Sequence, residues 1–269
     1  MKVTNIEDVE RLTDGNRVIG HFSMTNSAIN FIGKNNIVFF KENVNLTNTS
    51  IIFNADNSIV FFEKGSYTLS INMYNCSVAS FGGPIFTNPY IKSCITVAEA
   101  KNLFVGRNSI FSFGLWMRTC DAHLIYDIST KKRTNHSKSI YIGDNVWIGQ
   151  TASIFKGVEI QSGSIIGASS VISNKKIPSY TSWAGNPAKQ IRDNVTWMGT
   201  CSHEWESELS NKSDFIEDLT IYEYDSGVFI PFEEIEKKLT GETDVNKKLD
   251  YLIELSNISS PSRFVKIDL

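Results

Sequence analysis

Cysteine, histidine and long apolar runs are scarce in this sequence. The four cysteines, Cys76, Cys94, Cys120 and Cys201, are isolated and form no CxxC pair. Their spacing argues against a zinc site and a disulfide framework, and it fits a reducing cytoplasm. The longest apolar runs, such as Ile37–Phe40, are far too short to span a bilayer, and the N-terminal segment lacks the apolar core of a signal peptide. We therefore expect a cytoplasmic protein with no transmembrane segment, no metal and no nucleic-acid partner.

The net charge of −3 conceals an uneven distribution. Residues 204–256 hold 15 of the 29 acidic and 5 of the 26 basic residues, so they carry −10 while the rest of the chain carries +7. A basic body suits polyanionic ligands, among them coenzyme A and acidic sugars. An acidic tail beside an ordinary solvated surface explains the same counts. Both interpretations stay open, because charge counts do not locate a site.

Isoleucine recurs at every sixth position from Ile142 to Ile172, and glycine follows it at Gly143, Gly149 and Gly167. A helix turns by about 100° per residue, so this interval would scatter the isoleucines around its axis. A plain strand alternates with a period of two and needs no glycine at this interval. The ladder therefore predicts a parallel β-solenoid with three short faces in each coil of about 18 residues. One apolar residue per face points inward, and glycine accommodates the corners.

The N-terminal part of the chain predicts a less regular start of the same solenoid. Residues 35–40 repeat as residues 57–62, and thirteen asparagines, which favour turns, lie in the first 75 positions. We expect residues 1–100 to form wider, irregular β-coils that cap the first end, with residues 80–100 as a transition that lacks regular elements. An ordinary β-meander packed on the solenoid is the alternative.

The hexapeptide core is predicted to span residues 101–192. Val105, Phe111 and Met117 keep the six-residue interval upstream of the isoleucine ladder. Residues 127–139 are polar, basic and out of register with the ladder, so we interpret them as a loop extruded from a coil.

Residues 193–269 form the acidic C-terminal extension. Within it, residues 232–239 and 245–255 have the apolar spacing of amphipathic helices. We expect a small helical appendage that closes the second end of the solenoid, because an open end exposes core residues and unpaired strand edges.

Three segments resemble a known family. Ile142–Gln150, Ile166–Ala168 and Ala184–Lys189 are similar to the hexapeptide-repeat acyltransferases, and the resemblance covers roughly residues 103–192. It implies a left-handed parallel β-helix, usually a homotrimer, with acetyl-CoA bound in clefts between neighbouring subunits.

A narrower resemblance concerns Arg118–Asp127 together with Trp147. This pattern is most similar to the polysialic acid O-acetyltransferases of bacterial capsules. It implies transfer of an acetyl group from acetyl-CoA to a sugar hydroxyl of a capsular glycan.

His123 is the expected general base. A neutral imidazole that titrates near working pH can accept the hydroxyl proton during attack on a thioester. The resemblance assigns the base to the histidine just before the extruded loop, and only His123 of the four histidines has that position. Asp121 or a backbone carbonyl is a candidate to fix its tautomer. A structural alternative exists, because a count of six from Met117 reaches His123 and would direct it into the core.

Trp147 is the second catalytic candidate. It lies between two inward-facing positions and is expected to face outward, where the resemblance implies that its indole N–H lies beside the cofactor sulfur. Packing at a subunit interface is the alternative. The expected cofactor-binding residues are Trp147, Gln150, Ala168, Ser173, Lys175, Lys176, Trp183 and Lys189, with Arg192 beside them. Backbone groups near Gln150 and Ala168 are expected to bond the pantetheine arm and to supply an oxyanion donor.

The glycan acceptor is expected near His123. The candidate residues are Trp116, Arg118, Asp121 and Tyr126, with Lys131, Lys132 and Arg133 of the loop available to attract an anionic polymer. Other acceptors, such as a neutral sugar, an antibiotic or an amino acid, leave the fold and the base unchanged. A γ-type carbonic anhydrase needs three zinc-binding histidines and is disfavoured. A non-catalytic glycan-binding solenoid is the remaining alternative.

Overall fold

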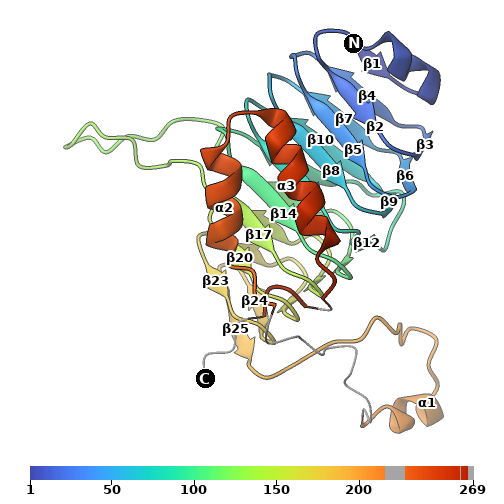
Figure 1. Cartoon of the computed structure of the whole chain (residues 1–269). Helices are drawn as coiled ribbons and strands as arrows, with labels where there is room; N and C mark the ends of the chain where they lie inside the picture. Colours follow the sequence, from blue (N-terminus) through green and yellow to red (C-terminus); the bar gives the residue numbers. More distant parts are fainter. Residues whose placement is uncertain (216–227, 261, 266–269) are drawn as a thin grey trace.

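The computed structural model describes residues 1–215, 228–260 and 262–265. The chain folds as a left-handed parallel β-helix, which confirms the predicted fold class. Each coil contributes one strand to each of three faces, and the stacked strands form long sheets (Figure 1). Sheets A and B run from the N-terminal coils into the hexapeptide coils without interruption, and the third face is formed by sheet C and then by sheet D.

The strands are distributed over the sheets as follows. Sheet A consists of β1 (Lys2–Val3), β4 (Ala28–Phe31), β7 (Ser50–Phe53), β10 (Leu69–Met73), β13 (Ser93–Val97), β16 (Trp116–Arg118), β19 (Ser153–Phe155) and β22 (Val171–Ile172). Sheet B consists of β2 (Arg17–Ile19), β5 (Ile37–Phe40), β8 (Ile59–Phe62), β11 (Val78–Phe81), β14 (Asn102–Val105), β17 (Ile140–Ile142), β20 (Glu159–Ile160) and β23 (Lys176–Ile177). Sheet C consists of β3 (Phe22–Thr25), β6 (Val44–Thr47) and β9 (Gly65–Tyr67). Sheet D consists of β12 (Ile85–Phe86), β15 (Ile110–Phe111), β18 (Trp147–Ile148), β21 (Ile165–Ile166), β24 (Ser182–Gly185) and β25 (Ala188–Arg192).

The isoleucine ladder forms the core of the C-terminal coils. Ile142 pairs with Ile160, Ile148 with Ile166 and Ile154 with Ile172, and all six side chains are buried. The predicted upstream continuation is confirmed, since the ladder is extended by the pairs Val105–Ile142, Phe111–Ile148 and Met117–Ile154. Each rung therefore places one apolar side chain directly on the next.

The N-terminal coils are wider but follow the same principle. The repeat between residues 35–40 and 57–62 is a parallel pairing of β5 with β8, which excludes a β-meander. The rings of Phe40 and Phe62 stack with centroids 5.5 Å apart. Asn35 and Asn57 occupy corners with positive φ, a conformation that asparagine tolerates better than most residues.

The predicted lack of regular elements in residues 80–100 is wrong. This stretch contains the end of β11, all of β12 and β13, and the parallel pairs that join them to neighbouring coils. Its glycines and prolines lie at corners and in the turn between strands, so they interrupt the coil without ending it.

The extruded loop leaves the solenoid between β16 and β17, at the corner that joins sheet A to sheet B. Met117 pairs with Ile154 of the next coil, and Ile142 pairs with Ile160. Ile154 and Ile160 are six positions apart in the sequence, whereas Met117 and Ile142 are 25 apart, so the additional residues form the loop. The loop therefore begins well before residue 127 and includes His123. It projects away from the body of the molecule (Figure 1).

The expectation that the C-terminal helices close the second end of the solenoid is wrong. Helices α2 (Phe232–Gly241) and α3 (Val245–Asn257) lie on the outer surface of sheet B (Figure 1). The reason is the composition of the sheet B strands, in which outward-facing positions are also apolar and need a cover. Ile59, Phe61 and Phe104 on the sheet pack in one cluster with Ile235 and Leu252 of the helices.

The two ends of the solenoid are covered by other elements. The 3-10 helix η1 (Ile6–Arg11) contributes Val9 at the first end, where it packs on the core. At the second end the hairpin of β24 and β25 contributes Trp183 and the buried Ala188. Helix α1 (Ser207–Lys212) lies apart from the solenoid in Figure 1. None of the described helices is both long and apolar enough to cross a membrane.

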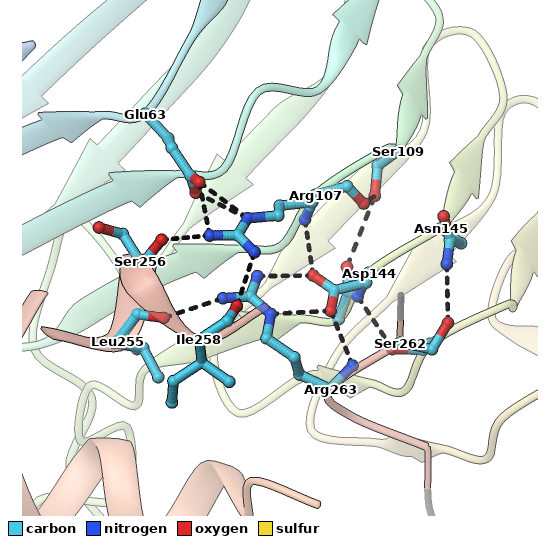
Figure 2. Close-up of polar contacts among 12 residues, drawn as sticks. Glu63, Arg107, Ser109, Asp144, Asn145, Leu255, Ser256, Ile258, Ser262 and Arg263 are labelled. Atoms are coloured by element: carbon cyan, nitrogen blue, oxygen red, sulfur yellow. Dashed lines mark hydrogen bonds and ion pairs between the residues drawn. The ribbon is translucent and has the colours of Figure 1, made fainter. Parts of the chain in front are cut away.

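A buried ion pair attaches the C-terminal segment to the corner between sheets B and D (Figure 2). The Arg263 guanidinium donates from Nη2 to Asp144 Oδ1 at 2.8 Å and from Nε to Asp144 Oδ2 at 3.0 Å, and both side chains are 1% exposed. The backbone N–H groups of Arg107 and Arg263 also donate to this carboxylate. The Arg107 side chain in turn bonds Glu63 and the carbonyls of Ser256 and Ile258, where α3 ends.

We predict that Arg263→Ala lowers the free energy of unfolding by about 3 kcal/mol, because it leaves a buried carboxylate without its guanidinium. The matched control is Lys212→Ala, which removes an exposed ion pair with Glu208 within α1 and is expected to cost less than about 0.5 kcal/mol. Urea unfolding followed by circular dichroism at 222 nm measures both. Equal losses in the two variants would contradict the role of the buried pair.

Candidate active site

His123 lies in the first half of the extruded loop, where the chain leaves the coil, and its side chain is exposed. The alternative that it faces the core is excluded, because the chain has already left the coil at this position. The backbone carbonyl of His123 accepts a hydrogen bond from Asn135 Nδ2 at 2.7 Å, and this bond joins His123 to the half of the loop that returns to the coil. The imidazole is therefore presented to solvent on a segment whose backbone is held.

Asn135 and Lys156 hold the base of the loop. The buried Asn135 side chain accepts from the N–H of Ile125 and donates to Asp121 at 2.9 Å. Lys156, at the corner of the next coil, bonds the Asp121 carboxylate and the carbonyl of Asn135. The hydrogen bond from Lys156 is the main cause that lowers the pKa of Asp121 below its ordinary value.

This arrangement gives Asp121 a role that the sequence did not suggest. Its carboxylate bonds Lys156 and Asn135, so it stabilises the loop that carries His123, and its effect on the His123 tautomer stays a prediction. Asn135 and Lys156 were not predicted, because each contacts a partner that is distant in sequence and no local pattern marks such a contact.

The remaining acceptor-side candidates lie on or beside the same loop. Trp116 is 50% exposed on the outer surface of β16, and Tyr126 is exposed and forms an antiparallel bridge with Arg133. Arg118 is partly buried at the end of β16. Arg133 pairs with Glu99 at 2.7 Å and lowers the pKa of that carboxyl. Trp116 on β16 and His123 and Tyr126 on the loop are therefore exposed, while the charge of Arg133 is paired with that of Glu99.

Trp147 faces outward from β18, as predicted, and is 41% exposed. The ring centroids of Trp147 and Trp197 are 6.3 Å apart, and the two ring planes make an angle of 47°. Trp197 is held by a hydrogen bond of 2.8 Å from its Nε1 to the carbonyl of Asn145. Trp147 and Gln150 line an open groove of about 650 Å³ between sheet D and the segment 197–203. Trp197 and His203, which also line it, were not predicted.

Gln150 and Ala168 lie one above the other at the corner between sheets D and A. The N–H of Ser169 donates to the carbonyl of Gln150 at 2.8 Å, as the predicted stacking requires. A Cβ on Gly149 would lie 2.5 Å from the backbone nitrogen of Ala168. Glycine follows the inward isoleucine here because the coils approach too closely for a side chain. Lys189 pairs with Ala184 in the hairpin that ends sheet D, and its side chain is exposed.

The other expected cofactor residues lie elsewhere. Ser173 and Lys175 lie at the corner between sheets A and B, and Lys176 begins β23 of sheet B, so all three are away from the column of Gln150 and Ala168. Lys176 forms ion pairs with Glu159 at 3.0 Å and Glu233 at 2.8 Å, and these raise its pKa. A single chain therefore does not bring all expected cofactor residues together.

Trp183 belongs to the core at the second end. It pairs with Ile166, packs on the core and donates from Nε1 to Thr181 Oγ1 at 3.0 Å. Lys175 Nζ lies 5.4 Å from its ring centroid. These contacts fit the packing interpretation of Trp183.

The two catalytic candidates lie on different sides of the same chain. His123 is on a loop that leaves the corner between sheets A and B, whereas Trp147 is on sheet D. In a three-sided solenoid that corner is opposite the third face. Among the residues that the structure describes, no cluster of three or more His, Cys, Asp or Glu side chains is arranged to hold a metal ion.

Comparison with known proteins identifies relatives of one kind. No family model matches the chain. Over 124 residues it is 33% identical to a polysialic acid O-acetyltransferase of Escherichia coli O1:K1 / APEC, a match that covers 46% of this chain and 40% of that protein. It is 28% identical over 103 residues to a polysialic acid O-acetyltransferase of Neisseria meningitidis, covering 38% of this chain and 48% of the relative. The chain thus spans less than half the length of these two curated relatives.

Two further matches extend the comparison. A galactoside O-acetyltransferase of Lactococcus lactis is 30% identical over 125 residues, which cover 45% of this chain and 53% of the relative. The crystal structure of the polySia-specific acetyltransferase NeuO superposes with a TM-score of 0.62 at 31% identity, and the match covers 74% of this chain and 93% of that one. Nearly the whole of that solved structure therefore has a counterpart here.

We predict that Lys156→Met loosens the loop that carries His123. Without this partner the pKa of Asp121 rises toward its ordinary value, and amide hydrogen exchange in residues 121–135 becomes up to about fivefold faster at pH 7. In the wild type the stabilisation is present above the unfolded pKa of Asp121 and is lost as the pH falls through its lowered folded value. Exchange followed by mass spectrometry measures the effect. Lys132→Met, at the exposed tip, is the control, and equal exchange in both variants would contradict the role of Lys156.

Proposed function

Because this chain belongs to the hexapeptide-repeat acyltransferase superfamily, we propose that it is an acetyl-CoA-dependent O-acetyltransferase acting on a sugar hydroxyl of an acidic capsular glycan such as polysialic acid. The proposal rests on two side chains that are exposed to solvent and are not needed for packing in the solenoid. His123 lies on a braced loop, and Trp147 is turned out of the solenoid wall. The 31% identity to a polySia-specific acetyltransferase over nearly its whole length supports the acceptor class.

His123 is the base in the proposed reaction. Its neutral imidazole removes the proton from the acceptor hydroxyl as the oxygen attacks the carbonyl carbon of the thioester. A new C–O bond forms, the C–S bond breaks, and the imidazolium returns the proton to the departing sulfur, which leaves as the free thiol of coenzyme A. The indole N–H of Trp147 is a suitable donor to that sulfur. A backbone N–H near Gln150 or Ala168 is a suitable donor to the oxyanion.

The residues on sheet D fit an extended thioester arm. Gln150 and Ala168 follow each other along the axis, so their backbone groups form a column beside Trp147. Lys189 lies at the end of this column, since it pairs with Ala184, the residue that stacks on Gly167. Of the expected lysines, Lys189 is therefore the best placed on this chain to meet the nucleotide phosphates. Ser173, Lys175 and Lys176 fit that role only as contributions from the corner of a second chain.

A homotrimer with sites between subunits is part of the proposal. Because His123 and Trp147 lie on different sides of one chain, one site needs the loop of one copy and sheet D of another. The loop also exposes apolar side chains that a second copy would cover, with Leu124 57%, Ile125 55% and Ile128 94% exposed. Surface of this kind is typical of an interface.

A neutral sugar is the second candidate acceptor. The 30% identity to a galactoside O-acetyltransferase supports it, although that match covers only 53% of the relative. The fold, the base and the cofactor side would be the same for both acceptors. The difference lies in the acceptor residues, where an anionic polymer gains from positive charge on the loop.

We predict that the purified chain releases free thiol from acetyl-CoA in the presence of polysialic acid, and less with a neutral galactoside. His123→Ala should lower kcat by at least about a hundredfold, because general base catalysis contributes this much or more. His21→Ala is the matched control and should retain activity, because His21 is an exposed histidine of the N-terminal coils, outside the proposed site. Near-normal turnover of His123→Ala would exclude His123 as the base.

A further inference from the structure

The segment Trp197–His203 runs along the outer surface of sheet D and forms the second wall of the groove beside Trp147. Trp197 anchors it through the hydrogen bond to the Asn145 carbonyl. Two residues later, Gly199 lies against β15, where an added Cβ would be 3.4 Å from Ile110 Cδ1. We call this segment the strap. It belongs to the same chain as the sheet that it faces.

The groove has an uncharged lining. Among the fourteen described residues that line it, none is Asp, Glu, Lys or Arg. Ile110, Phe113 and Met198 contribute apolar surface, while Gln150 and Ser112 contribute polar groups. Neither the phosphates of a nucleotide nor the carboxylates of an acidic glycan find a countercharge there. A neutral chain with a few amide groups matches this surface, because apolar lining with few polar groups is typical of small-molecule sites.

We propose that the strap encloses the pantetheine and thioester end of acetyl-CoA, and that Trp197 is a positioning residue for Trp147. The inference rests on the proposed function and adds an intramolecular wall to its cofactor side. Pantetheine is the uncharged part of coenzyme A, so the uncharged groove selects this part over the nucleotide. The charged Lys189 lies beyond the groove, at the end of the column of Gln150 and Ala168.

Trp197 restricts the indole of Trp147 by contact. The two rings lie 6.3 Å apart with an angle of 47°, within the range of favourable aromatic pairs. Because the Trp197 ring is itself fixed by Asn145, it limits the orientations that the partly exposed Trp147 adopts. A donor whose orientation is fixed before the sulfur arrives loses less entropy on binding.

The substitution Trp197→Ala tests the role of the strap. Calorimetric titrations of the 269-residue chain and of its variant with two probes measure the effect. The dissociation constant for coenzyme A is expected to rise about tenfold, whereas that for adenosine 3′,5′-bisphosphate, which lacks pantetheine, stays unchanged. The KM for acetyl-CoA rises by a similar factor, while the number of binding sites per chain stays at the wild-type value. Phe215→Ala, which removes an 89% exposed ring that does not line the groove, is the control and should change neither constant.

Thr200→Glu provides a second test that leaves the anchor intact. It adds a carboxylate to the wall that the strap forms. It should weaken the binding of coenzyme A at least as much as Trp197→Ala does, whereas Thr200→Ser should leave binding unchanged. Unchanged affinity for coenzyme A in both Trp197→Ala and Thr200→Glu would overturn the proposal, as would an equal loss for the bisphosphate. These titrations need no acceptor, so failure to acetylate polysialic acid would refute the proposed function without touching this result.

Discussion

The in-register stacking of coils is the constraint on which the rest of this structure depends. Ile142, Ile148 and Ile154 each lie on the residue 18 positions later, and the parallel hydrogen bonds between coils repeat with them. A shift by one residue would turn the isoleucines outward and break every rung. The close approach of the corners also dictates glycine at Gly149, where any side chain would meet the next coil.

The same stacking determines where functional groups can lie. An outward position on a rung stays on its face in every coil, so Trp147 belongs to sheet D and Gln150 to the adjacent corner. His123 is free of this restriction only because the chain leaves the coil between β16 and β17. The loop is then braced again by Asn135 and Lys156. The result is a rigid wall that carries Trp147 and a separate loop that carries His123.

The features that follow from the repeat could be predicted from the sequence, whereas contacts between segments that are distant in sequence could not. The interval of six residues was sufficient for the parallel solenoid, for the inward isoleucines and for the outward Trp147, because each follows from local periodicity, whereas the left-handed twist came from the family resemblance. The cover of sheet B could have been anticipated, since Ile59–Phe62 is apolar on both sides of the strand. The contacts of Lys156 with Asp121 and of Trp197 with Trp147 join segments 35 and 50 residues apart, and no local pattern marks them.

In the proposed enzyme, the base and the cofactor wall of one site come from two copies of the chain. The direct measurement is the activity of mixed oligomers made by co-expression of His123→Ala with Trp147→Ala, each nearly inactive alone. If each site combines the loop of one copy with sheet D of the next, random mixing restores intact sites to about a quarter of the wild-type activity. Activity no higher than that of the separate variants would contradict the account and would put both groups of a site on one chain.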